Sequence, residues 1–243
     1  MTETMIEATD IGMALGEGPG RVNALKGITL SLAGGELTLL MGPSGSGKTT
    51  LLSVLGCMLS PTSGNVRIRG RSTSGLSAEQ LAQVRREHVG FVFQSYHLFP
   101  TLTAAENVRL ALDVRCDHAL EARAKADKAL ATVGLSHKAN AFPRALSGGE
   151  QQRVAVARAI VGDASVILAD EPTAALDSEN GQAVMTVLAE IAKDPARATF
   201  IVTHDPRIMP FADRILRIED GRIVSDQRGG ADVRILHALK YAS

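Results

Sequence analysis

The segment from Gly42 to Thr49, with the sequence GPSGSGKT, constrains the fold of this chain more than any other feature. It follows a short apolar run, residues 37–41, which predicts a strand buried on both faces of a parallel sheet. Residues 50–59 then continue as a predicted helix. Glycines let the backbone curl so that several N–H groups point at one anion, and the following helix adds the positive end of its dipole. The segment therefore predicts a strand–loop–helix unit that binds phosphate.

Two side chains of this phosphate loop have specific predicted roles. Lys48 can reach the β- and γ-phosphates of a nucleotide, and the Thr49 hydroxyl can ligate Mg²⁺. A plain Gly/Ser surface loop is the alternative, but the strand and helix patterns on either side favour a nucleotide site. The predicted nucleotide contacts from this segment are Gly42, Pro43, Ser44, Gly45, Ser46, Gly47, Lys48, Thr49 and Thr50.

Composition limits what else the chain can do. With 45% hydrophobic and 21% charged residues, its 243 residues suit a large globular domain or a core with a subdomain. A formal net charge of +0 and only 3% aromatic residues argue against a nucleic-acid partner. The chain has no apolar run of membrane-spanning length and no signal-peptide pattern, so we expect a cytoplasmic protein. Any action at a membrane would then require a separate membrane partner.

The order of predicted elements indicates an α/β fold. Strands dominate up to residue 41, with Gly34-Gly35 predicted as a hairpin turn between two of them. A helical stretch follows, and strands return at residues 165–169 and 199–202, before a hairpin around Asp220-Gly221. We expect a phosphate-loop NTPase core of mostly parallel sheet, with an N-terminal antiparallel β subdomain and an inserted helical subdomain.

The predicted boundaries follow from this order. One domain is expected over residues 1–228, with its core at about 1–94 and 160–228 and the helical subdomain at about 95–159. Residues 229–243 are expected to form a C-terminal tail, in which residues 233–241 fit a short amphipathic helix.

Two carboxylates follow a second buried strand pattern. The apolar residues 166–169 lead directly into Asp170 and Glu171. In an open parallel sheet, ligands gather at the carboxyl ends of the strands. Asp170 is therefore predicted to hold Mg²⁺, directly or through water, and Glu171 to orient or deprotonate an attacking water. Alone, this pattern also fits a strand end with two solvated charges, but the phosphate loop favours the functional interpretation.

A second glycine-containing segment, LSGGEQQR at residues 146–153, precedes a predicted helix that runs to Ile160. Ser147 fits the N-cap, and Glu150 stands three residues later, as in a capping box. Gly148 and Gly149 at the helix start can form a second backbone site for an anion. The spacing alone fits a well-capped helix equally well.

With these motifs, the chain resembles the nucleotide-binding subunits of ATP-binding cassette (ABC) transporters. The resemblance covers about residues 5–225. It rests on the signature segment (residues 146–150), on the phosphate loop with residues 166–171, and on three further motifs in the family's order: Gln94 at a strand end, Ala175-Leu176-Asp177, and Thr203-His204-Asp205.

The resemblance implies ATP and Mg²⁺ as ligands and a head-to-tail dimer with a second copy of the chain. Each ATP would lie between the phosphate loop of one copy and Ser147, Gly148 and Gly149 of the other, with Asp177 also at the nucleotide. Thr49, Asp170 and Gln94 would bind the metal. Gln94 would also link the site to an integral-membrane permease, and His204 would contact the γ-phosphate and help Glu171 order the water.

One position departs from the family pattern. An aromatic residue near the N-terminus normally stacks on adenine, and counting back from the following strand places that position near Leu15. We expect Leu15, with Val22, to pack the base by apolar contact only. Selection among nucleotide bases should then be weaker, because stacking on an aromatic ring contributes roughly 1–3 kcal/mol.

Several strings look like one branch of the family, namely residues 51–56, 90–100 and 168–173. They are similar to the ATPases of lipoprotein-releasing, macrolide-efflux and cell-division-type systems. The branch implies export or mechanotransmission of lipoprotein, lipid or drug-like cargo, on the inner face of the cell membrane. Residues 95–115 would then form much of the surface that takes the permease.

Three alternatives stay open at this point. Importer ATPases share every catalytic motif. Soluble, non-transport ABC ATPases usually carry two cassettes or a long coiled coil, neither of which is present here. An unrelated phosphate-loop kinase would need neither the signature segment nor His204.

Overall fold

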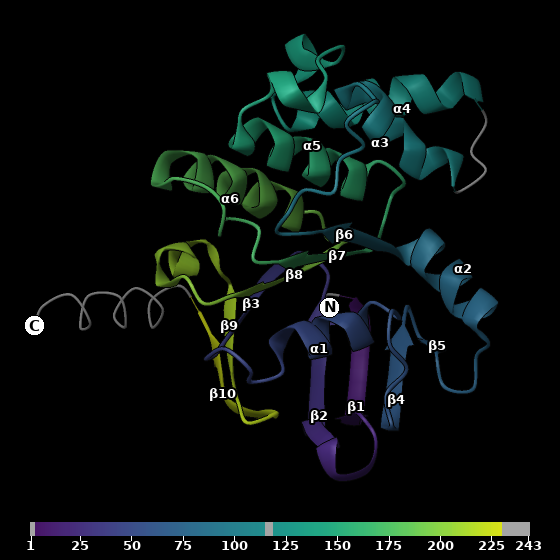
Figure 1. The fold of residues 1–243 in the computed structure, drawn as a ribbon, viewed down its shortest axis with the longest axis vertical. Helices are drawn as coiled ribbons and strands as arrows, with labels where there is room; N and C mark the ends of the chain where they lie inside the picture. The colour runs from purple at the N-terminus through teal and green to yellow at the C-terminus, as the bar shows by residue number, and fades with distance from the viewer. Residues whose placement is uncertain (1–2, 115–118, 230–243) are drawn as a thin grey trace, which may run out of the picture.

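The computed structural model describes residues 3–114 and 119–229, which form two sheets with helices between and above them (Figure 1). The smaller sheet is antiparallel, with strand order β2-β1-β4-β5. Its strands are β1 (Thr4–Leu15), β2 (Val22–Ala33), β4 (Ser63–Ile68) and β5 (Arg71–Ser72).

The larger sheet has strand order β10-β9-β3-β8-β7-β6. Strands β6, β7, β8, β3 and β9 are mutually parallel, and β10 pairs antiparallel with β9. Its bounds are β3 (Glu36–Met41), β6 (Val89–Val92), β7 (Val166–Asp170), β8 (Ala198–Thr203), β9 (Arg214–Glu219) and β10 (Arg222–Arg228). These strands confirm the mostly parallel core and the C-terminal hairpin.

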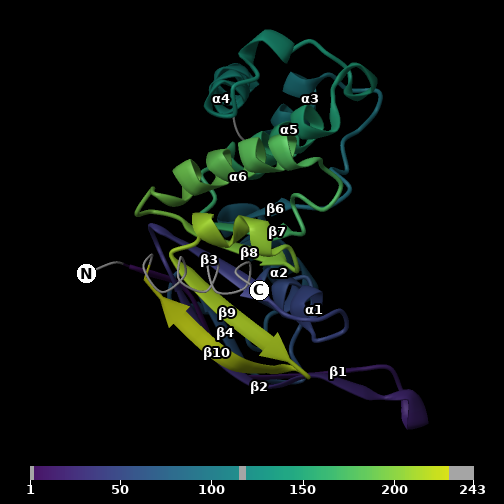
Figure 2. The ribbon, with the colours of Figure 1, turned by 90° about the vertical axis from the view of Figure 1, so that its left-hand side faces the viewer.

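The helices surround this sheet in layers. Figure 2 shows α6 above the larger sheet, with α3, α4 and α5 stacked further out, while α1 lies on the other side. The helices are α1 (Lys48–Leu55), α2 (Ala78–His88), α3 (Ala104–Asp113), α4 (Ala119–Thr132), α5 (Gly148–Ile160) and α6 (Ser178–Ala192). Short 3₁₀ turns are η1 (Gly18–Gly20), η2 (Ser136–Lys138), η3 (Pro143–Ala145) and η4 (Pro206–Phe211).

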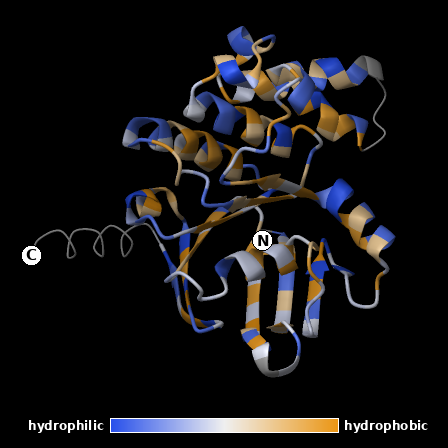
Figure 3. Ribbon diagram, in the orientation of Figure 1, coloured by the Kyte–Doolittle hydropathy of each residue, from blue (hydrophilic) through white to orange (hydrophobic). Residues whose placement is uncertain are grey.

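The central strands are buried on both faces, as their apolar runs predicted. In β7, Ile167 and Ala169 pack into a core shared with α3–α6, whereas Val166 and Leu168 pack into a core shared with α1 and the smaller sheet. Figure 3 shows these strands as mostly hydrophobic and the helices as carrying both kinds of residue. No helix within residues 3–114 and 119–229 has the length and hydropathy needed to cross a bilayer.

The predicted hairpin at Gly34-Gly35 is wrong. The turn exists, but β2 and β3 on either side of it belong to different sheets. Gly34 N–H donates to the Glu3 carbonyl, and Gly35 N–H donates to the Arg197 carbonyl, so the turn carries the chain from one sheet to the other. A Cβ on Gly34 would lie 2.0 Å from the Pro195 carbonyl oxygen, which explains the glycine.

The helix predicted over residues 50–59 begins earlier and ends earlier, as α1 covers Lys48–Leu55. It stops at Gly56, where a Cβ would lie 2.2 Å from the Phe91 ring, so the close approach of β6 requires the glycine. The sequence pattern does not predict β1 as a separate strand. The amphipathic helix predicted at residues 233–241 lies outside the described residues.

Candidate functional site

A cleft of about 990 Å³ opens at the carboxyl ends of the central strands. It brings together the phosphate loop, the end of β1, the start of β2 and the loops that follow β6, β7 and β8. The lining residues are Leu15, Val22, Asn23, Ala24, Lys26, Pro43, Ser44, Gly45, Gly47, Lys48, Thr49, Thr50, Gln94, Glu171, His204, Asp220 and Gly221.

Backbone geometry in the phosphate loop depends on its glycines. Gly47 has φ +102° and precedes α1, and a Cβ there would lie 2.6 Å from the Ala24 carbonyl oxygen. A Cβ on Gly42 would lie 2.2 Å from the Ile218 carbonyl oxygen. Both positions therefore exclude any side chain, and they leave a tight cradle of backbone N–H groups at a helix N-terminus, which fits a phosphate.

Lys48 lies over this cradle. Its ammonium donates to the carbonyl oxygens of Gly42 and Pro43, both at 2.8 Å, and the residue is 9% exposed. The cation is therefore held at the mouth of the loop, within the same cleft, where it can meet the charge of a bound phosphate.

Thr49 and Asp170 form an oxygen pair beside the loop. The Thr49 hydroxyl donates to Asp170 Oδ1 at 3.4 Å. Burial raises the pKa of Asp170 and the charge of Glu171 raises it further, while the Thr49 hydrogen bond and Lys48 lower it. Hydroxyl and carboxylate oxygens are ligands of the kind that Mg²⁺ binds, with phosphate and water oxygens completing its coordination shell. In the part of the chain that the structure describes, no group of three or more His, Cys, Asp or Glu side chains gathers to hold a metal by itself.

Glu171 and His204 meet across the ends of β7 and β8. His204 Nδ1 lies 2.7 Å from Glu171 Oε1, and the His204 backbone N–H donates to Oε2 at 3.4 Å. Glu171 has φ +48°, and its N–H donates to the Val202 carbonyl of β8. The left-handed backbone and this bond turn the carboxylate toward the loop after β8. Glu171, the predicted base, and His204 thus form one hydrogen-bonded pair.

The signature segment lies outside the cleft of its own chain. Ser147 caps α5 by accepting from Glu150 N–H at 3.2 Å, and Glu150 Oε2 accepts from Ser147 N–H at 2.8 Å. The backbone hydrogen bond from Ser147 is the main cause that lowers the pKa of Glu150. This confirms the predicted capping box. Asp177 likewise caps α6, accepting from the Asn180 N–H at 2.9 Å.

Gly148 and Gly149 are glycines for reasons visible within one chain. A Cβ on Gly148 would lie 2.9 Å from the Tyr96 hydroxyl, and one on Gly149 would lie 2.3 Å from Asn180 Oδ1. The start of α5 is therefore packed between the loop after β6 and the first turn of α6. Of the predicted site residues, Gly42, Ser46, Ser147, Gly148, Gly149, Asp170 and Asp177 are not among those that line the cleft.

Leu15 and Val22 stand opposite each other in the β1–β2 pairing and line the cleft. They are 39% and 63% exposed, so both present aliphatic surface to whatever binds there. Sequence reasoning did not select Asn23, Ala24, Lys26, Asp220 or Gly221 as site residues. Only the folded structure brings these residues to the site. For example, Gly221 N–H donates to the Ser46 carbonyl of the phosphate loop at 3.0 Å.

Comparisons with known proteins identify the family of this chain. The family model described as ABC transporter matches residues 25–174. The macrolide export ATP-binding/permease protein MacB of Bradyrhizobium diazoefficiens is 43% identical over 233 residues, which cover 96% of this chain and 36% of that protein. This chain thus spans about a third of the length of the curated relatives it matches.

Two solved structures share the fold. The ATP-binding cassette MJ0796, in a dimeric post-hydrolysis state bound to ADP and Pi, has a TM-score of 0.83 and 38% identity, covering 92% of this chain and 98% of that chain. The structure of cbiO1 from Clostridium perfringens, part of the ABC transporter complex cbiONQ, has a TM-score of 0.85 and 27% identity, covering 98% of this chain and 92% of that chain. The chain therefore belongs to the ABC transporter family and has the fold of its ATP-hydrolysing cassettes, which confirms the family and the fold class predicted from the motifs.

Proposed function

We propose that this chain binds and hydrolyses ATP as a pair of identical cassettes and so drives an integral-membrane permease. The observation that carries the proposal is the position of the signature segment. Ser147 and the two glycines after it lie at a capped helix start outside their own cleft, while most of the phosphate loop, Gln94, Glu171 and His204 line that cleft. A second copy can supply what one cleft lacks, and the similar MJ0796 cassette is dimeric.

Within each site, the backbone N–H groups of the phosphate loop and Lys48 would bind the phosphates. Thr49 and Asp170 would hold Mg²⁺, with Gln94 beside them, and the ion would neutralise part of the phosphate charge. Glu171 would accept a proton from the water whose oxygen bonds to the γ-phosphorus as the bond to ADP breaks. His204, already hydrogen-bonded to Glu171, would hold that carboxylate in place.

Pairing follows from the same electrostatics. A triphosphate between two cassettes would face the N-terminus of α1 in one copy and of α5 in the other, and each partly buried helix end contributes up to about 2 kcal/mol. A ligand that binds only the closed pair stabilises that pair by RT ln(1 + [L]/Kd). ATP binding would therefore close the dimer, and hydrolysis would release it.

Export is the proposed direction, with lipoprotein, lipid or drug-like molecules as the class of cargo and the inner face of the cell membrane as the location. The support is the similarity to relatives named for macrolide export. Phe99 and Val114, which are 50% and 54% exposed, lie within the region predicted to meet the permease.

Glu171→Gln tests this function. The amide keeps the shape of the side chain but cannot accept a proton, so turnover should fall about 10²- to 10⁴-fold while ATP still binds. Light scattering after size exclusion should then show a dimer with ATP and a monomer without it. Lys48→Ala is the comparison variant. It should lose phosphate binding and therefore form no dimer with ATP. Undiminished ATP hydrolysis by Glu171→Gln, or a monomer at saturating ATP, would rule the proposal out.

A further inference from the structure

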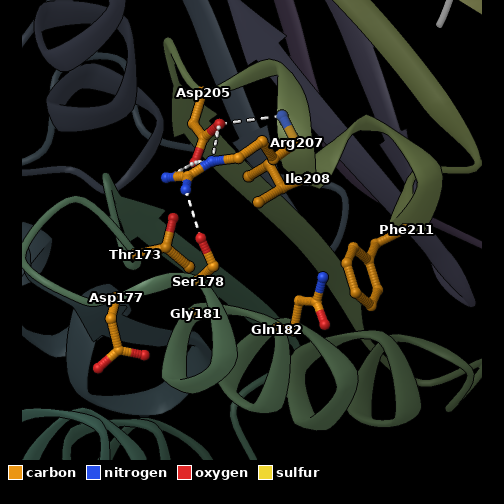
Figure 4. Close-up of a pocket in the computed structure, with 9 residues that line it drawn as sticks. All are labelled: Thr173, Asp177, Ser178, Gly181, Gln182, Asp205, Arg207, Ile208 and Phe211. Atoms are coloured by element: carbon orange, nitrogen blue, oxygen red, sulfur yellow. Dashed lines mark hydrogen bonds and ion pairs between the residues drawn. The ribbon is translucent and has the colours of Figure 1, made fainter.

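Beside the cleft, an arginine that belongs to no predicted motif bridges two of the loops that do. Figure 4 shows Arg207, from η4 after β8, reaching across to Ser178 at the start of α6. Its Nη1 donates to the Ser178 hydroxyl at 2.8 Å. On the other side, its Nε donates to both carboxylate oxygens of Asp205 at 3.0 Å, and Nη2 lies 2.8 Å from Oδ2.

The two ends of this bridge are neighbours of site residues. Asp205 directly follows His204, which is bonded to Glu171. Ser178 directly follows Asp177, the cap of α6. The guanidinium thus connects the loop that carries His204 to the loop that carries Asp177, although Arg207 and Ser178 lie 29 residues apart in the chain.

The bridge lies at a small gap between the two loops. A hollow of about 30 Å³, the room of about one water, lies between them and is bordered by Asp177 and Arg207. Further in, Ile208 is 4% exposed and Met209 is 5% exposed, so η4 is anchored in the core at that end. The outer end of the contact, next to the site, is held by Arg207.

Asp205 is well suited to orient this arginine. It accepts the Arg207 backbone N–H at 2.9 Å as well as the side-chain bonds, so one carboxylate fixes both the turn and the guanidinium. Burial raises the pKa of Asp205, but the hydrogen bonds and charge of Arg207 outweigh this and hold that pKa below its usual value. With the guanidinium held in this way, its Nη1 donates to the Ser178 hydroxyl.

The Asp177 end of the bridge also reaches the signature segment. Asn180, bonded to Asp177, stands against Gly149, since a Cβ there would lie 2.3 Å from Asn180 Oδ1. A movement of the first turn of α6 would therefore displace the start of α5 and, through Arg207, the loop that carries His204.

We propose that Arg207 is a positioning residue that couples the Asp177 loop to the His204 loop, so that docking of a second copy of this chain aligns His204 and Glu171 for hydrolysis. This inference rests on the proposed pairing of cassettes. Arg207 is not among the residues that line the cleft, so it would act through the loops that carry Asp177 and His204.

The test is steady-state ATP hydrolysis by the full chain with Arg207→Met, which keeps the apolar stem and removes the bridge. We expect kcat to fall about five- to twentyfold, the size expected from losing hydrogen bonds to a charged group, with little change in KM for ATP. The Hill coefficient for ATP should fall toward one. Ser178→Ala, which removes only the acceptor, should act in the same direction, and the double variant should be no worse than Arg207→Met alone.

Arg228→Met is the matched control. The Arg228 side chain is 58% exposed against 59% for Arg207, and it pairs with Glu36 at 3.8 Å, remote from the cleft. Its kcat and Hill coefficient should equal those of the unchanged chain. Equal values for Arg207→Met, or additive effects of Arg207→Met and Ser178→Ala, would overturn the coupling.

Pairing is measured separately in the Glu171→Gln background. We expect the ATP-bound dimer to persist when Arg207→Met is added, because the bridge acts after docking. Loss of the dimer only when Arg207→Met is present would overturn the coupling and assign Arg207 to the interface itself. Absence of a dimer in Glu171→Gln alone would instead defeat the proposed function and the coupling with it.

Discussion

At the scale of single residues, the wall of the cleft where a nucleotide base would lie is aliphatic. Leu15 and Val22 face each other at the ends of β1 and β2, and both are exposed. Aliphatic carbon attracts a base by apolar contact but lacks the π-face that makes stacking favourable by roughly 1–3 kcal/mol per base. The binding energy should therefore come mainly from the phosphate loop.

Leu15→Tyr should restore a stacking surface. We expect ATP to bind about thirtyfold more tightly and the ratio of ATP to GTP affinity to change, as a stacking contribution of about 2 kcal/mol, near the middle of that range, implies. Titration with a fluorescent nucleotide measures both. Val224→Tyr, at a 54% exposed position on β10 that is not part of the cleft, should leave both values unchanged. The same result for Leu15→Tyr would refute the aliphatic base site.

At the scale of elements, α5 holds the loop after β6 in a strained conformation. Tyr96 and His97 have φ +57° and +48°, values that non-glycine residues adopt only where their surroundings hold them. Arg158 on α5 donates to the carbonyl of Tyr96 at 2.7 Å and to that of His97 at 2.5 Å. Burial lowers the pKa of Arg158, so the guanidinium depends on these two carbonyls to offset its loss of water.

Arg158→Met should therefore release this loop. We expect the free energy of unfolding to fall by about 2 kcal/mol, since hydrogen bonds from a charged donor are worth about 1.5–3 kcal/mol each and the release of backbone strain offsets part of the loss. Amide exchange should rise at residues 95–97. Arg109→Met on α3 breaks only an exposed i,i+4 pair with Asp113 and should change stability by less than about 0.5 kcal/mol. Unchanged exchange in Arg158→Met would contradict this account.

The sequence predicted the elements best where local chemistry sets them. The capping box at Ser147 marks the start of α5, because an N-cap and its partner lie within four residues. The phosphate loop is equally local. By contrast, Gly34 and Gly56 are glycines because Pro195 and Phe91, distant in sequence, approach them closely. The same applies to the Gly221 contact with Ser46 and to the Arg207 bridge, which no short window of sequence contains.

At the scale of the whole molecule, a buried arginine joins the two sheets. Arg214 on β9 has a side chain that is 5% exposed. Its Nε and Nη2 donate to the two oxygens of Asp226 on β10, each at 2.7 Å, and its Nη1 donates to the Ser31 carbonyl of β2 at 2.7 Å. Because the phosphate loop leaves β3 of the larger sheet and Leu15 and Val22 belong to the smaller one, this junction helps to fix the two sides of the cleft relative to each other.

Asp226→Asn should weaken that junction in a pH-dependent way. The Arg214 hydrogen bonds hold the pKa of Asp226 below its usual value, although burial opposes them. An acid with a lowered folded-state pKa stabilises the fold above its unfolded pKa of about 3.9 and loses that contribution as pH falls through the folded value. We expect a loss of about 1–2 kcal/mol at pH 7, reduced for the partial exposure of Asp226, in urea unfolding. The difference in unfolding free energy from the unchanged chain should stay constant down to about pH 5 and narrow below about pH 4.

Glu219→Gln, at an exposed position on β9, is the control and should show no such difference at pH 7. A difference for Asp226→Asn that is independent of pH would mean that the junction depends on shape rather than on the charge of Asp226.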